Sequence, residues 1–280
     1  NSPLVVGVGD GENFLASDVS AFIAHTKRAL ELGQDQVVEV TPTAVVVTDL
    51  DGTKITPREY EITWDAAAAE RGGFSHFMLK EIFEQPAAVR DTVLGRASRD
   101  TGHVHLDEIG LDDADLKAID KITLLACGTS WHAALVGKFM IEELAKVPVE
   151  VDYGSEYRYR SPLVLPGTLA VAITQSGETA DTLAAFKEAR RRGAFGVAIC
   201  NVVGSMATRE AAGTVFTHAG PEIGVAATKS FTSQCTVLTL LALLLGRIRH
   251  LSSADGIRIL DELEAIPAKV ASILTLDSHI

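Results

Sequence analysis

The sequence predicts an α/β protein in which a parallel sheet flanked by helices follows a strand-rich region. Two observations lead to this prediction. From residue 121 to about 249, short apolar β runs alternate with helical patterns, which is typical of βαβ units and a parallel sheet. Of the 280 residues, 47% are hydrophobic and 22% are charged, so the chain can form a core of ordinary size. Its length leaves room for about two domains.

The net charge excludes one large class of partners. With 25 basic and 37 acidic side chains, the formal charge is −12, whereas nucleic-acid binding depends on clustered Lys and Arg. We therefore expect no nucleic-acid partner. A small anion held locally by backbone amides and hydroxyls remains compatible with this charge.

Cysteine usage and hydropathy indicate the compartment. Cys127, Cys200 and Cys235 are odd in number and widely scattered, which predicts a reducing, cytoplasmic location without a disulfide framework. Their spacing matches no zinc pattern, so we expect no metal and no cofactor. The most apolar stretch, residues 235–245, is shorter than the ~20 residues of a membrane span, and we expect no membrane partner.

The first 65 or so residues are predicted to be rich in strands. Residues 4–9, 36–40 and 43–48 form β-branched or apolar runs. Asp51-Gly52 follows the third run and is a strong hairpin signal. A calcium loop around Asp49 and Asp51 is the alternative, but further acidic ligands are absent there, so the turn is favoured.

The middle of the chain changes in composition. Residues 64–73 are rich in Ala, Glu and Gly and suit a connector. A helical pattern opens at residues 77–83 and is expected to end near Gln85-Pro86, because proline disfavours a helical residue before it. Residues 107–120 are acidic and predict a solvated helix or loop. His103 and His105 could bind a metal, but no third ligand lies at a suitable spacing, so a polar surface strand is favoured.

The stretch from residue 121 to 249 predicts five strands and three helices. The strands are expected at residues 122–126, 149–153, 169–174, 197–201 and 214–217. The helices are expected at residues 131–146, 179–192 and 228–245. The last helix is mostly apolar and is therefore predicted to be buried or at a subunit interface.

Two turns in this stretch share one design. Cys127-Gly128-Thr129-Ser130 and Gln175-Ser176-Gly177-Glu178-Thr179 each place glycine and hydroxyl residues between a strand and a helix. Free amides at a helix start, together with the helix dipole, favour a negative charge at that point. In an open parallel sheet ligands bind at the carboxyl ends of strands, so together the two turns predict a pocket for one phosphate.

Other interpretations of these turns remain open. Ser, Thr and Gly are also ordinary cap and turn residues. Glu178 would repel an anion unless its side chain faces away from the pocket. Neither turn fits G-x-G-x-x-G or the Walker pattern, so dinucleotide and nucleoside triphosphate binding are poorly supported.

Two further residues have alternative roles. Cys127 precedes a helix start and could be a nucleophile with His132 as its base, but it ends an apolar strand, and packing or pocket lining is favoured. Lys229 stands in a loop that enters a helix and could meet an anion, although a lone lysine there is weak evidence.

The motifs resemble a known family. The two turns, with the second extended to Gln175-Ser176-Gly177-Glu178-Thr179-Ala180-Asp181-Thr182, resemble the sugar isomerase (SIS) fold family. Residues 11–18, 76–86 and 222–232 resemble, more closely, the family of isomerizing glutamine–fructose-6-phosphate aminotransferases. The resemblance implies a transferase that frees ammonia from glutamine in an N-terminal-nucleophile glutaminase domain. Two SIS subdomains would then convert fructose 6-phosphate to glucosamine 6-phosphate.

The resemblance also implies a domain plan. Residues 1–65 resemble the strand-rich C-terminal end of the glutaminase domain, 66–111 the linker and start of the isomerase half, 112–250 the first SIS subdomain, and 251–280 the helical approach to the second. The chain starts at Asn1 and lacks an initiator Met, so we expect an internal segment of a longer protein. Asn1 is not the glutaminase nucleophile, which is an N-terminal Cys in the family.

The site residues follow from the same resemblance. Phosphate contacts are implied for Ser130, Gln175, Ser176 and Thr179, with Thr129 adjacent and Thr174 where Ser is frequent. Contacts on the sugar side are implied for Cys127, Gly128, Val225 and Ala227, although the alanine stands where a hydroxyl residue can occur. The family's acid–base Glu, ring-opening His and Schiff-base Lys belong to later sequence, so no catalytic residue is expected here. This segment is expected to supply the sugar-phosphate anchor of the full enzyme and to be inactive alone.

The implied partners are fructose 6-phosphate or glucosamine 6-phosphate, glutamine at the glutaminase site, and a second copy of the chain in a homodimer. A non-catalytic SIS module that senses a sugar phosphate is the alternative. Such a regulator should carry a helix-turn-helix and a basic face, and residues 1–110 show neither.

Overall fold

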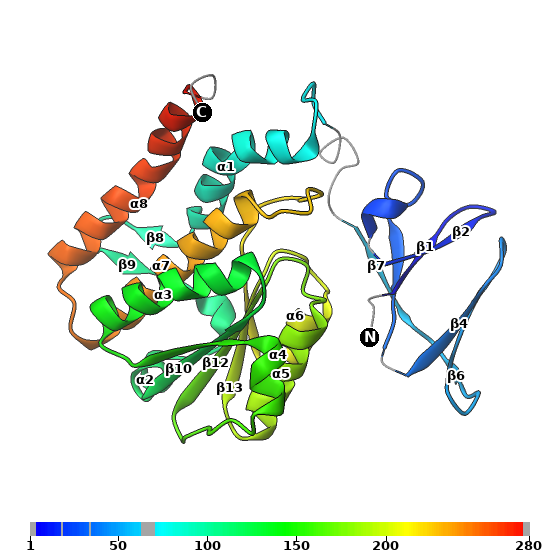
Figure 1. Cartoon of the computed structure of the whole chain (residues 1–280), viewed down its shortest axis with the longest axis horizontal. Helices are drawn as coiled ribbons and strands as arrows, with labels where there is room; N and C mark the ends of the chain where they lie inside the picture. Colours follow the sequence, from blue (N-terminus) through cyan, green and yellow to red (C-terminus); the bar gives the residue numbers. More distant parts are fainter. Residues whose placement is uncertain (1–3, 18, 34, 63–70, 277–280) are drawn as a thin grey trace. The chain divides into compact units, whose positions relative to one another are not determined.

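The computed structural model describes residues 4–17, 19–33, 35–62 and 71–276. The chain forms two compact units, Asn1–Gly72 and Gly73–Ile280, each of which is described by itself (Figure 1). Most of the connector expected at residues 64–73 lies outside the described residues.

The first unit contains two small antiparallel sheets. Their strand orders are β2-β1-β3-β7 and β4-β5-β6. The three strands expected from sequence are confirmed, and the others had weaker patterns. The strands are β1 (Val5–Val8), β2 (Asn13–Ala16), β3 (Arg28–Glu31), β4 (Gln36–Val40), β5 (Val45–Asp49), β6 (Lys54–Ile55) and β7 (Arg58–Glu61).

The predicted turn at Asp51-Gly52 joins β5 to β6 in an antiparallel hairpin. The Thr53 amide donates to Oδ1 of Asp49 at 2.9 Å and to Oδ1 of Asp51 at 2.8 Å. Both carboxylates therefore serve the turn, and the hairpin prediction is confirmed.

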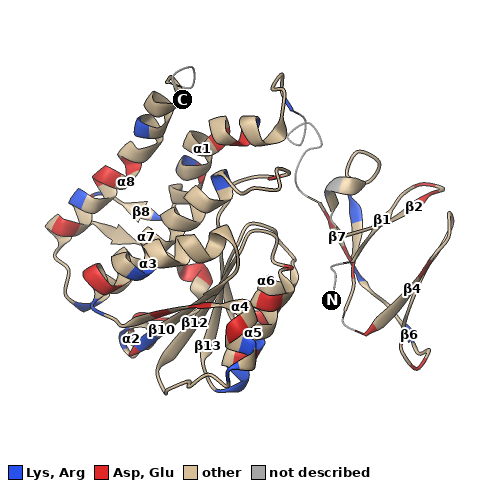
Figure 2. Cartoon of the chain, viewed as in Figure 1, with Lys and Arg blue, Asp and Glu red and all other residues tan. Residues whose placement is uncertain are grey.

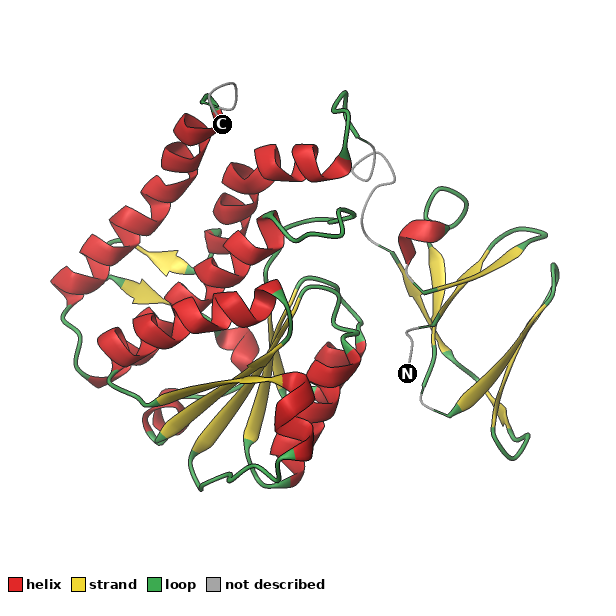
Figure 3. Ribbon diagram, viewed as in Figure 1, coloured by secondary structure: helices red, strands yellow, loops and turns green. Residues whose placement is uncertain are grey.

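The second unit is built on a five-stranded sheet whose neighbouring strands are all parallel (Figure 3). Its strand order is β11-β10-β12-β13-β14. The predicted strand series is confirmed to within two residues at each end. The strands are β10 (Lys121–Ala126), β11 (Val149–Tyr153), β12 (Thr168–Thr174), β13 (Phe195–Cys200) and β14 (Gly213–Phe216).

Alternating residues of the strands face two helical layers. One set, including Leu124 and Val171, packs into the large core that also contains residues of α3 (Thr129–Ala145) and α7 (Lys229–Arg249). The other set, including Leu125 and Ala172, packs against α4 (Gly154–Tyr159) and α5 (Ala180–Arg191). This two-residue period is what a sheet covered on both faces requires. The α/β prediction is confirmed.

The helix α7 is longer than the apolar stretch noted in the sequence. It has 21 residues, and by length and composition alone it could cross a membrane, so the argument that this stretch is too short was wrong. However, 67% of its most apolar window is buried inside the unit. Such burial is typical of the central helix of a globular core, as predicted for this element.

The helix α1 (Phe77–Val93) continues through Pro86, so the predicted stop near Gln85-Pro86 was wrong. Proline lacks the amide that would bond the carbonyl four residues earlier. The Gln85 side-chain amide donates to that Ile82 carbonyl at 3.0 Å. Because the carbonyl keeps a partner and Pro86 is buried in the core, the helix tolerates the proline.

A short two-stranded sheet, a 3-10 turn and a short helix follow α1 in the chain, before the five-stranded sheet. His103 and Val104 form β9, which pairs with β8 (Ala97–Ser98), so the strand prediction is confirmed for His103, whereas the exposed His105 lies just after the strand. Residues 107–120 contain a 3-10 turn and α2 (Asp113–Lys117). They are less solvated than predicted, because Ile109 and Leu116 enter the core.

The helix α8 (Ser253–Leu274) accounts for the helical character expected after residue 250. It packs on α1, and its Leu260 belongs to the same core as Val93 of α1. Two short helices were not expected: α4, and α6 (Met206–Glu210).

Candidate functional site

The two glycine and hydroxyl turns lie side by side at the carboxyl edge of the sheet. Across the sheet, the strands stand in the order β11-β10-β12-β13-β14. From β10 the chain continues first to one neighbour, β11, and then to the other, β12, so the strand order reverses between β10 and β12. Leu125 of β10 pairs with Ala172 of β12, which brings the turns after Ala126 and Thr174 next to each other. Such a switch point is where open α/β sheets bind ligands.

The first turn is open to solvent. Gly128 is exposed and has φ +59° and ψ −137°, a combination that side-chain-bearing residues rarely adopt. The helix α3 begins at the next residue, Thr129, which is also exposed. Free amides of its first turn therefore lie at the edge of the sheet. Ser130, the second residue of α3, is only 8% exposed.

The second turn is held by its own hydroxyls. The Thr174 Oγ1 atom lies 3.1 Å from Thr179 Oγ1 and accepts from the Gly177 amide at 3.2 Å. The Ser176 hydroxyl accepts from the Glu178 amide at 3.2 Å. Thr174 is 2% exposed and lies beneath the turn, whereas Gln175, Ser176 and Thr179 are partly exposed. The helix α5 begins directly after Thr179.

Gly177 admits no other residue in this arrangement. Its φ is +72°, and a Cβ atom there would overlap the Ser205 side chain and lie 2.9 Å from Cys200 Sγ. The Gly177 carbonyl accepts from the Ala207 amide at 2.9 Å. The turn is therefore packed directly on the start of α6.

The Glu178 side chain faces away from the first turn of α5. Its Oε1 accepts from the Met206 amide, 2.8 Å away, at the start of α6. Burial raises the pKa of this carboxyl, while the Met206 amide and the Arg209 charge act in the opposite direction. The sequence analysis required that this carboxylate not face a bound anion, and its hydrogen bond to the Met206 amide fits that requirement.

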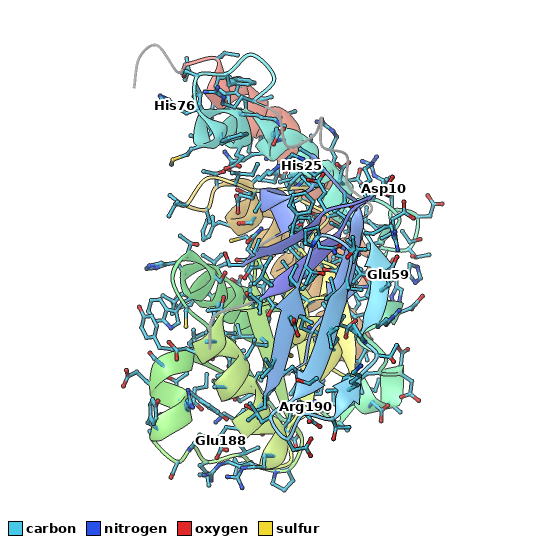
Figure 4. All side chains as sticks on the ribbon, turned by 90° about the vertical axis from the view of Figure 1, so that its right-hand side faces the viewer. Asp10, His25, Glu59, His76, Glu188 and Arg190 are labelled. Atoms are coloured by element: carbon cyan, nitrogen blue, oxygen red, sulfur yellow. The ribbon has the colours of Figure 1, made fainter. Side chains whose placement is uncertain are left out.

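The Lys and Arg residues of α5 lie away from the two turns. The turns themselves contain neither residue type. Glu188 and Arg190 are near the C-terminal end of α5, which returns the chain to the amino edge of the sheet (Figures 2 and 4). Arg191 and Arg192 there pair with Glu188. A bound anion would therefore be held by amides and hydroxyls.

A third segment reaches the same edge of the sheet. Residues 217–228 follow β14 and lead into α7. Val225 is fully exposed and Ala227 partly exposed, so both can meet a ligand outside the sheet. Lys229 does not serve as a free cation, because it is 3% exposed and its Nζ pairs with Glu84 Oε2 at 2.6 Å.

Three residues that shape this segment were missed by the sequence analysis: Glu81, Asn201 and Glu222. Asn201 accepts through Oδ1 from Thr217 Oγ1 and from the Ala219 amide, and it donates through Nδ2 to the Gly220 carbonyl. Glu81 lies on the buried stripe of α1 with Ala88 and Thr92. A carboxylate in an apolar helical stripe was the available signal, since it requires a partner.

Cys127 is partly buried at the end of β10. The neighbouring His132 is exposed and packs edge-on against Trp131, with ring centroids 5.2 Å apart. Packing or lining of the site stays the favoured role for the cysteine.

Comparison with known proteins agrees with the α/β fold of the second unit. The SIS domain model matches residues 115–244. An isomerizing glutamine–fructose-6-phosphate aminotransferase of Corynebacterium glutamicum is 49% identical over 281 residues, which cover 100% of this chain and 45% of that protein. The enzyme of the same name from Streptomyces coelicolor is 50% identical over 279 residues, covering 99% of this chain and 45% of that protein. The chain thus spans about 45% of the length of these curated relatives.

Solved structures similar to this chain include the following two. The C-terminal domain of glucosamine-fructose-6-phosphate aminotransferase from Francisella tularensis has a TM-score of 0.71 and 39% identity, over 75% of this chain and 58% of that one. A glucosamine-6-phosphate deaminase from Thermotoga maritima, at 20% identity and a TM-score of 0.52, covers 69% of this chain and 54% of its own and shares the fold.

Proposed function

Because the chain carries an SIS domain over residues 115–244 and is about half identical to isomerizing glutamine–fructose-6-phosphate aminotransferases, we propose that it forms part of such an enzyme. The SIS domain would hold the phosphate group of fructose 6-phosphate or glucosamine 6-phosphate. The full enzyme would transfer the amide nitrogen of glutamine to the sugar and isomerise the ketose to an aldose.

One observation carries the assignment of the site. Two glycine and hydroxyl turns, each followed by a helix of twelve or more residues, stand on adjacent strands at the switch point of the sheet. The phosphate would meet the first-turn amides of α3 and α5 and the hydroxyls of Ser176 and Thr179. Gln175, Thr129 and Ser130 would complete this set, and Thr174 would support it from below. Cys127, Gly128, Val225 and Ala227 would face the sugar.

The proposed contribution to catalysis is orientation. A phosphate fixed at one end of the sugar restricts how the carbonyl end lies, and such remote binding energy can assist a reaction at the other end. The proton transfers themselves need acid and base groups of suitable pKa. We assign none of those groups to the described residues.

The remaining domain assignments are also proposals. We propose that residues 1–65 are the end of a glutaminase domain, 66–111 the linker and start of the isomerase half, 112–250 the first SIS subdomain and 251–280 the approach to a second. The strand-rich first unit and the end-to-end identity with the relatives support this plan. A homodimer in the cytoplasm that takes glutamine as its second substrate completes the proposal.

Removal of two hydroxyls from the second turn tests the site. In the full-length natural protein, Ser176→Ala combined with Thr179→Ala should weaken fructose 6-phosphate binding at least ~10-fold, since each hydrogen bond to a charged group contributes about 1.5–3 kcal/mol. Titration calorimetry measures the change. The matched control is Ser155→Ala combined with Thr208→Ala, which removes two hydroxyls outside the turns. Equal affinity in both double variants would contradict the site.

A second assay separates the enzyme from a non-catalytic sugar-phosphate sensor. The full-length protein supplied with glutamine and fructose 6-phosphate should form glutamate and glucosamine 6-phosphate in equal amounts. A sensor would bind fructose 6-phosphate and leave glutamine intact.

A further inference from the structure

The segment between β14 and α7 is held at three points. Asn201 binds its first part, residues 217–220, through three hydrogen bonds of 2.7–2.9 Å. Glu222 Oε1 accepts from the Thr228 and Ser230 amides at 2.9 and 3.2 Å, which fixes its junction with α7. The third point, in the middle of the segment, is formed by a residue from a distant part of the chain.

That residue is Glu81 on α1. Its side chain is 2% exposed, and its Oε1 accepts from the Ile223 amide at 2.6 Å and from the Gly224 amide at 3.0 Å. A Cβ on Gly224 would lie only 2.5 Å from Glu81 Oε2, so the glycine lets the backbone approach the carboxylate closely. Glu81 precedes its partner Ile223 by 142 residues. A buried carboxylate bound to backbone amides strongly restricts where that backbone can lie.

Between the Glu81 and Glu222 anchors lie three residues, Val225, Ala226 and Ala227. Val225 and Ala226 are exposed, although the residues on both sides of the trio are tied down. The trio is therefore anchored at both ends, with Val225 and Ala226 facing solvent.

The trio is presented at the edge of the sheet that carries the two turns. The Gln175 carbonyl accepts from the Asn201 amide at 3.2 Å, and the Asn201 side chain then binds residues 217–220. The strand β14 is two strands from β12, which is about 10 Å. One hydrogen-bonded series thus joins the second turn to the segment that Glu81 holds.

We propose that Glu81 is a positioning residue for the sugar part of the ligand. Its carboxylate holds Val225–Ala227 where they border a hexose whose phosphate lies in the two turns. Phosphate binding itself does not depend on Glu81, because the turns are built from other elements. This inference rests on the proposed function of the two turns.

The test compares two ligands in the full-length natural protein. Glu81→Ala should weaken fructose 6-phosphate binding by about 10-fold, equivalent to ~1.4 kcal/mol, and should change the affinity for inorganic phosphate less than 2-fold. Glu81→Gln keeps an acceptor oxygen for the Ile223 and Gly224 amides and should restore fructose 6-phosphate affinity to within about 3-fold of the original. Titration calorimetry gives both constants.

Val89→Ala is the matched control, because Val89 is fully buried on the same helix and its loss opens a small cavity. It should lower stability without separating the two ligands. Equal fructose 6-phosphate affinity in the original protein and in Glu81→Ala would overturn the positioning role and leave the proposed function intact. A parallel loss of both ligands, or a failure of Glu81→Gln to restore binding, would also overturn it. If the unaltered protein binds neither ligand, the proposed function itself fails.

Discussion

The two turns of the candidate site have similar sequences but different physical surroundings. At Gly128 the space around the α-carbon is open, and the following Thr129 is exposed. At Gly177 a side chain would overlap Ser205, and the neighbouring hydroxyls bond within the turn. The first turn is therefore open, whereas the second is packed, and its internal bonds fix where its partly exposed groups lie. A shared motif can hide this difference between an open and a packed turn.

The largest expected effect comes from Gly177→Ala. Steric overlap costs about 1–3 kcal/mol and a positive φ another 1–3 kcal/mol, so the free energy of unfolding should fall by about 2–6 kcal/mol. Urea denaturation measures the loss. Fructose 6-phosphate binding should fall as well, because α6 and the turn must separate.

Ser205→Gly added to Gly177→Ala separates the two causes. It removes the overlap with Ser205 but leaves the positive φ and the 2.9 Å approach to Cys200 Sγ, so about 1–3 kcal/mol should return. No recovery in the double variant would show that the Ser205 overlap is not what makes this glycine necessary.

A smaller effect is expected at the open turn. Gly128→Ala meets no atom within 4 Å, so only its φ of +59° opposes the change, at about 1–3 kcal/mol. Its loss of stability should be no larger than that of the Gly177→Ala/Ser205→Gly variant in the same urea experiment, because that variant keeps the Cys200 contact as well as a positive φ. A loss as large as that of Gly177→Ala alone would erase the contrast between the turns.

The two turns also show which features of the fold and the site could be predicted from the sequence. The strands and both turns were predictable because buried strands leave apolar runs and turns leave glycine, all within a few neighbouring residues. The continuation of α1 through Pro86 was not predictable, because it depends on a hydrogen bond from the Gln85 side chain to the Ile82 carbonyl. The anchor formed by Glu81 depends on a contact across more than 140 residues, which no local pattern encodes.

The direction of the Glu178 side chain belongs with these long-range features. Its acceptor role at Met206 spans 28 residues, and the sequence could state only the condition that the carboxylate face away. The structure meets the condition because α6 begins where that carboxylate lies.

The smallest effect is expected from Glu178→Gln, which tests whether this side chain only joins the second turn to the start of α6. Burial raises the pKa of Glu178 above its ordinary value of 4.5, so its protonated form favours the folded state. That contribution is complete below the ordinary pKa and is lost as the pH rises through the folded-state pKa. Glutamine stays neutral and still accepts from the Met206 amide, so the variant should be at least as stable as the original at pH 7.5 and should lose less stability between pH 4.5 and 7.5. Urea denaturation at both pH values measures this difference in stability. The affinity for inorganic phosphate at pH 7.5 should change less than about 2-fold, because the carboxylate faces away from the proposed phosphate site. A marked gain in phosphate affinity would instead place the charge of Glu178 beside the anion and would contradict its orientation toward α6.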